Sequence, residues 1–111
     1  MSCEISHMWV AEWNGKVVGM VGLVCNENHE PGVAELKRMV VIPSCRGKGI
    51  GKKLLNELTA HAKNQGIKKL VLSTASIQTA AIQMYKKHGF KLVGVTTLFR
   101  DITVKTFHMQ L

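Results

Sequence analysis

The apolar residues change their spacing at Pro43, and this change limits the fold more than any other feature of the chain. Before it, residues 8–13, 16–24 and 33–42 are rich in β-branched and aromatic side chains and are predicted to be strands. Asn14-Gly15 separates the first two strands and favours a two-residue hairpin, because both of its positions need a positive φ. Pro43 has no N–H to donate to a ladder, so the third strand is predicted to end there.

Beyond Pro43 the apolar residues recur at helical spacing. The positions that share this spacing are Leu54, Leu55, Leu58 and Ala62. Gly66 stands where this helix would end on a left-handed cap. The remaining predicted elements are a strand at 69–74, a helix at 79–88 closed by Gly89, and strands at 90–98 and 103–111. The order β-β-β-α-β-α-β-β predicts an α/β fold of the α+β type, with a mixed sheet and at least one parallel crossover.

The length of 111 residues leaves room for one domain, over residues 1–111. Lysine and arginine number 15 against 7 acidic residues, and the net charge of +8 suits a nucleic acid, a membrane surface or a small ligand with phosphates. The lysines are spread over most predicted elements and aromatic residues make up only 5%, so no nucleic-acid partner is expected. No apolar run approaches the roughly 18 residues that span a bilayer, so no membrane span is expected.

The three cysteines are Cys3, Cys25 and Cys45. Their number is odd and their spacing is wide, so free thiols in a reducing, cytoplasmic compartment are expected. The five histidines are equally scattered, and no metal site is expected. A membrane-anchored parent remains an alternative if the chain is a truncated form of a longer protein.

The segment Arg46-Gly47-Lys48-Gly49-Ile50-Gly51 lies between a predicted strand and a predicted amphipathic helix. Glycines bring the backbone close to a ligand, and a helix N-terminus favours an anion by roughly 0.3 to 2 kcal/mol. The P-loop pattern GxxxxGK[ST] is absent. The dinucleotide pattern GxGxxG has Lys52 in its third glycine position, and no acidic residue ends the strand at 69–74. A phosphate or pyrophosphate ligand is predicted, and a tight turn without a ligand is the alternative.

Three motifs, in order, resemble those of the GNAT superfamily of N-acetyltransferases. Arg46, Gly49 and Gly51 match the pattern [RQ]-x-x-G-x-[GA], residues 39–43 resemble a strand ending in V-x-P, and residues 81–90 resemble A-x-x-[LM]-Y-x-x-x-G-F. The resemblance covers about residues 8–111 and implies a minimal GNAT-like fold that lacks the first strand and two helices. Within the superfamily, the segments 33–36, 77–78 and 104–111 are most similar to the camello-like members.

The resemblance implies acetyl-CoA as cosubstrate and a primary amine, on a small molecule or a peptide, as acceptor. The cofactor-binding residues that it implies are Met39, Val40, Val41, Arg46, Gly47, Lys48, Gly49, Ile50, Gly51, Lys52, Gln78 and Tyr85. The pantetheine arm would run between residues 39–41 and 70–74, and no metal is implied.

The resemblance also implies two catalytic residues. Tyr85, the only tyrosine, would be the general acid that protonates the leaving thiolate, and its alternative is a core tyrosine. Glu35 would be the general base for the amine, and its alternative is a solvent-facing strand residue or an ion-pair partner of Lys37 or Arg38.

Two other readings stay open at this point. The chain could be a non-catalytic acyl-CoA-binding module, or a truncated acetyltransferase with an incomplete acceptor site. A chain without the usual front wall could also complete its site as a homodimer.

Overall fold

The protein is described here by a computed structural model that covers residues 6–25, 30–100 and 102–111. Its elements are β1 (Ser6–Trp13), β2 (Lys16–Val24), β3 (Val33–Val41), the 3₁₀ turn η1 (Pro43–Cys45), α1 (Ile50–Asn64), β4 (Lys69–Ala75), α2 (Thr79–His88), β5 (Lys91–Thr97) and β6 (Thr103–Gln110). The predicted order of elements is confirmed, and their ends differ from the predicted ones by no more than two residues.

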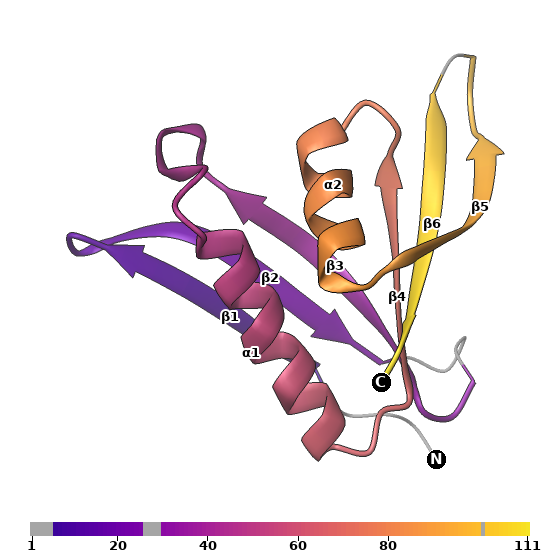
Figure 1. Cartoon of the computed structure of the whole chain (residues 1–111), viewed down its shortest axis with the longest axis horizontal. Coiled ribbons are helices and arrows are strands. Elements are labelled where there is room, and N and C mark those ends of the chain that lie inside the picture. Colours follow the sequence, from indigo (N-terminus) through magenta and orange to yellow (C-terminus); the bar gives the residue numbers. More distant parts are fainter. Residues whose placement is uncertain (1–5, 26–29, 101) are drawn as a thin grey trace.

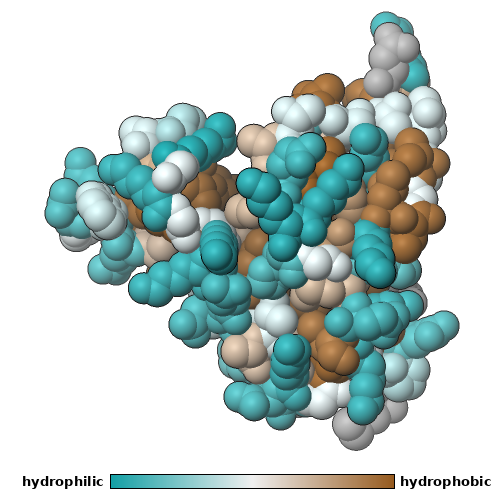
Figure 2. Space-filling view, viewed as in Figure 1, coloured by the Kyte–Doolittle hydropathy of each residue, from teal (hydrophilic) through white to brown (hydrophobic). Residues whose placement is uncertain are grey.

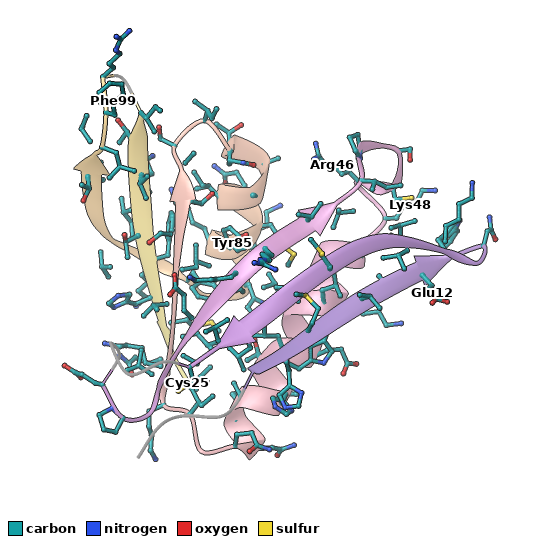
Figure 3. The ribbon with its side chains drawn as sticks, turned by 180° about the vertical axis from the view of Figure 1, so that it is seen from behind. Glu12, Cys25, Arg46, Lys48, Tyr85 and Phe99 are labelled. Carbon is teal, nitrogen blue, oxygen red and sulfur yellow. The ribbon has the colours of Figure 1, made fainter. Side chains whose placement is uncertain are left out.

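The strands form one mixed sheet in the order β1-β2-β3-β4-β6-β5. Both helices lie on the same face of this sheet (Figure 1). The core lies between the helices and the sheet, and its fully buried side chains include Leu55 and Leu58 of α1 and Phe107 of β6. Figure 3 shows the opposite face, which no helix of the described residues covers.

The turn between β1 and β2 has the predicted form. Asn14 and Gly15 both have a positive φ, of 52° and 78°. Trp13 therefore pairs directly with Lys16, as a two-residue hairpin requires. Gly19 of β2 allows a close approach instead: a Cβ there would lie 3.3 Å from the Ile50 side chain of α1.

Strands β3 and β4 are parallel neighbours for only part of their length. Their pairs are Val33 with Lys69, Ala34 with Leu70 and Glu35 with Val71. Beyond these pairs the two strands diverge, so the sheet opens into two lobes (Figure 1). The surface is hollowed between the lobe of β1–β3 and the lobe of α2 (Figure 2).

A β-bulge interrupts β3 beside this opening. The register with β2 passes from Met20–Val40 to Gly22–Lys37, so β3 contains an extra residue between the two pairs. Arg38 lies in the bulge with φ 58°, a left-handed conformation that a non-glycine residue rarely adopts. The bulge was not predicted, since the sequence around Arg38 contains no glycine or proline.

The cysteines differ from the sequence-based expectation. Cys45 is free and buried, but Cys25 is disulfide-bonded, which corrects the expectation of free thiols. Wide spacing along the chain does not prevent two cysteines from meeting in the fold. Cys3 lies outside the described residues. The disulfide also removes the sequence argument for a reducing compartment.

No described helix is long and apolar enough to cross a membrane. Within the described ranges, no three His, Cys, Asp or Glu side chains are grouped so that they could hold a metal ion.

Candidate active site

A cavity of about 360 Å³ occupies the opening between β3 and β4. It is lined by residues 35–39 of β3, residues 72–74 of β4, and Gln78, Ala81 and Tyr85 of α2 and its N-cap. The cavity therefore brings together four residues that the sequence had indicated, Glu35 and Met39 of β3 with Gln78 and Tyr85 from the second half of the chain.

Tyr85 reaches this cavity from the core side of α2 (Figure 3). Its side chain is only 4% exposed and its ring packs edge-on against Phe90, with 5.9 Å between the ring centroids. Burial raises the pKa of Tyr85 to about 12, so the phenol keeps its proton at neutral pH. Among the described residues, no group forms a hydrogen bond with its hydroxyl. Tyr85 thus combines a core ring with a hydroxyl that is available to a ligand.

Glu35 lies at the closed end of the cavity, in the last pair that joins β3 to β4. Its carboxylate is 3.9 Å from the Lys37 ammonium, and the two side chains are 22% and 50% exposed. The ion pair expected as an alternative role is therefore present. It leaves the carboxylate partly exposed within the cavity, so the two roles do not exclude each other.

The glycine loop follows η1 and ends at the N-cap of α1. Gly47 and Gly49 both have left-handed backbones, with φ 80° and 79°, and a Cβ at either position would have no atom within 4 Å. The amides of residues 47–52 donate to no carbonyl within the described part of the chain, and the first helical bond runs from the Lys53 amide to Gly49. Six successive free amides on an open loop at a helix N-terminus are suited to an anion such as a pyrophosphate.

Two basic side chains of this loop are already engaged. The Arg46 Nε donates a hydrogen bond of 3.0 Å to the Val41 carbonyl oxygen. The Lys48 ammonium lies 5.0 Å from the ring centroid of Trp13, at the tip of the β1–β2 hairpin. Figure 3 shows Arg46 and Lys48 together at this end of the molecule. The contact of Lys48 with the hairpin was not predicted, because it joins residues from separate elements.

Two other predicted ligand residues contribute to packing. Ile50 packs against the core, and Gly51 is buried against Met84 of α2. A Cβ at Gly51 would lie 2.5 Å from the Met84 sulfur, so a larger residue at this position would require the flexible Met84 side chain to shift. The backbone amides of Ile50 and Gly51 remain available to a ligand, whereas their side chains do not.

The predicted path for the pantetheine arm is corrected in one respect. Leu70 and Val71 are paired with β3, so the opening on the β4 side begins only at Leu72. On the β3 side, Met39, Val40 and Val41 lie beyond the last pair with β4 and leave one strand edge without a neighbour. An extended chain could pair with this edge.

The sequence profile of the Acetyltransferase (GNAT) family matches residues 2–90. The chain belongs to this family. The three sequence motifs predicted membership of the GNAT family, and the family profile confirms it. The family uses acetyl-CoA.

Individual relatives agree. The chain is 43% identical over 90 residues to N-acetylaspartate synthetase of Xenopus tropicalis, covering 81% of this chain and 32% of that protein. It is 40% identical over 91 residues to the probable N-acetyltransferase camello of Xenopus laevis, covering 82% and 41%. The resemblance to camello-like members is thus confirmed. The chain spans less than half the length of these two relatives.

A solved structure gives the same fold. The IAA acetyltransferase from Bacillus cereus superposes with a TM-score of 0.84 at 25% identity, over 94% of this chain and 77% of that one. The predicted fold class of this GNAT chain is therefore confirmed.

Proposed function

We propose that this GNAT chain is an acetyl-CoA-dependent N-acetyltransferase that transfers the acetyl group to a primary amine by direct attack. The observation that carries the proposal is the alignment of two features on one strand. The cavity with Tyr85 opens beside the middle of β3, and the loop of free amides follows the end of the same strand. A long ligand with a pyrophosphate at one end and a thioester at the other fits this arrangement.

Binding would use the backbone more than the side chains. The amides of residues 47–52 would hold the pyrophosphate, with Arg46 and Lys52 adding positive charge. The unpaired edge at Met39, Val40 and Val41 would pair with the pantetheine arm. Gln78, at the N-cap of α2, would offer its side-chain amide from across the cavity.

Proton transfer would use two residues of the cavity lining, Glu35 of β3 and Tyr85 of α2. Acetyl-CoA supplies an activated acetyl group. As the amine nitrogen bonds to the acetyl carbon and the carbon–sulfur bond breaks, Glu35 accepts the proton that leaves the amine, and Tyr85 donates a proton to the departing thiolate. Tyr85 is protonated at neutral pH, as a general acid must be, and its raised pKa makes it a weaker acid than an exposed tyrosine.

The test measures binding and turnover separately. Saturating acetyl-CoA should raise the melting temperature by mass action, and desulfo-CoA, which keeps the phosphates, should do the same. A panel of primary amines should then release free thiol from acetyl-CoA. Binding without thiol release from any amine would identify a non-catalytic acyl-CoA-binding module, and no thermal shift would overturn the proposal altogether.

A further inference from the structure

Arg38 lines the cavity from a β-bulge, with a backbone conformation that is rare for a non-glycine residue. It lines the opening beside Glu35 and Lys37, and the bulge holds its backbone at φ 58°. A left-handed conformation is energetically unfavourable for a non-glycine residue. Such strain persists where the surrounding structure enforces it, and it is frequent at binding sites. The bulge turns this part of β3 out of the regular ladder, at the edge of the cavity.

The charges around Arg38 are unbalanced. The cavity lining contains one carboxylate, Glu35, and two cations, Lys37 and Arg38. Glu35 is the ion-pair partner of Lys37, at 3.9 Å. Within the part of the chain that the structure describes, no carboxylate pairs with the Arg38 guanidinium. An arginine that lines a cavity without an acidic partner offers a planar pair of donors that matches a carboxylate.

The position of Arg38 separates it from the phosphate-binding loop. Arg38 precedes Val41, the last residue of β3, by three residues, which corresponds to roughly 10 Å of extended strand. The free amides begin further along the chain, at Gly47. Arg38 is therefore separated from the loop by the strand edge at Val40 and Val41, so a ligand group beside Arg38 would belong to the acceptor and not to the pyrophosphate.

We propose that the acceptor carries a carboxylate close to its amine, as a free amino acid does, and that Arg38 binds this carboxylate. The inference rests on the proposed acetyl transfer and adds the substrate class to it. Glu35 and Arg38 then form a matched pair for a zwitterion, with the carboxylate of Glu35 toward the ammonium group and the guanidinium toward the carboxylate. A cationic acceptor such as a polyamine would meet the net positive charge of the lining and is disfavoured.

The experiment compares amino acids with their own carboxamides, for example leucine with leucinamide, as acceptors in the thiol-release assay. Each pair keeps the amine and the side chain and differs in the carboxylate. The variants are Arg38→Gln, which removes the guanidinium, and Arg38→Lys, which keeps the charge and loses the planar pair of donors. Arg100→Gln is the matched control, because Arg100 also has a positive φ but lies at the β5–β6 turn, where it contacts Phe99.

For the amino acids, Arg38→Gln is expected to lower kcat/KM by about 10- to 100-fold, mainly through KM, with a smaller loss in Arg38→Lys. For the carboxamides the change should stay within about 3-fold, and Arg100→Gln should match the wild type with both acceptors. The KM for acetyl-CoA should not change in any variant.

Three results would overturn the inference while leaving the proposed acetyl transfer in place. These are equal losses for acid and amide, a raised KM for acetyl-CoA in Arg38→Gln, and a wild type that prefers the amide or a polyamine. If no amine is acetylated although acetyl-CoA binds, the proposed function itself fails, and this inference with it.

Discussion

The Arg46 side chain is bound to the Val41 carbonyl oxygen by a hydrogen bond of 3.0 Å from its Nε. This bond joins the first residue of the glycine loop to the last residue of β3. It uses one donor of the guanidinium and leaves the terminal nitrogens for a ligand. The loop and the unpaired edge of β3 are thereby held in a fixed relation to each other.

Replacement of Arg46 by glutamine should weaken the binding of acetyl-CoA. The variant loses the hydrogen bond from the guanidinium to the Val41 carbonyl oxygen and the positive charge beside the free amides. We therefore expect the Kd for acetyl-CoA to rise about 10-fold. Isothermal titration with acetyl-CoA measures the change. Arg100→Gln removes the same charge at a distance and should bind as the wild type does. Equal losses in both variants would show that only the overall charge matters.

Replacement of Tyr85 by phenylalanine should separate chemistry from packing. The ring stays in the core and the hydroxyl has no hydrogen-bond partner among the described residues, so the free energy of unfolding should change by less than about 1 kcal/mol. The value of kcat should fall by about 10²- to 10⁴-fold, as expected for loss of a general acid. Urea unfolding and single-turnover kinetics provide the two measurements. A variant that loses stability but retains kcat would assign Tyr85 to the core alone.

The ionisation of Tyr85 can be followed directly, because it is the only tyrosine in the chain. In the folded protein the tyrosinate absorbance should appear near pH 12, and in denaturant near the ordinary value of 10.0. Between these values the folded chain keeps a proton that the unfolded chain has lost, so stability should fall as the pH rises from about 10 through about 12. Far-ultraviolet circular dichroism recorded alongside shows whether the chain is still folded. A titration near 10 in folded protein would contradict the buried position.

The role of Glu35 can be separated from its ion pair with Lys37. Glu35→Gln removes the carboxylate, and we expect kcat to fall by about 10- to 100-fold. Lys37→Gln breaks the same ion pair but keeps the carboxylate, and it should retain most of the activity. Both variants are compared in the thiol-release assay at several pH values. Similar losses in the two variants would indicate that the ion pair is needed, and not a base.

The contact between Gly51 and Met84 predicts that Gly51→Ala destabilises the wild type but stabilises a Met84→Ala variant. Alanine at position 51 would push the Met84 side chain aside, and because that side chain is flexible we expect a cost at the lower end of the roughly 1 to 3 kcal/mol that overpacking produces. In a Met84→Ala background the collision is gone, so Gly51→Ala should stabilise the helix by up to about 1 kcal/mol. A double-mutant cycle by urea unfolding measures the coupling. The same destabilisation in both backgrounds would show that the glycine is needed for another reason.

Local patterns in the sequence were sufficient to predict the order of the strands and helices. Asn14-Gly15 predicted the hairpin, and the spacing of Leu54, Leu55 and Leu58 predicted the buried face of α1, because turn conformation and helical periodicity depend on neighbours in the chain. The motif around Tyr85 predicted a residue that does line the cavity.

Features that depend on distant residues were not predicted. The bulge at Arg38 arises from the register between two strands, and the start of the opening at Leu72 arises from where β3 and β4 stop pairing. The role of Gly51 follows from the position of Met84 on another helix. Each of these features requires a contact whose two sides lie far apart in the sequence, and such contacts leave no local pattern.

The short ladder between β3 and β4 has a mechanical consequence. Only three residue pairs join β3 to β4 within the described residues, and the rest of the connection between the two halves of the sheet comes from the core cluster under the helices. Ala34 and Leu70 form the middle pair and do not line the cavity. A larger side chain at either position would therefore widen or narrow the cavity from outside it.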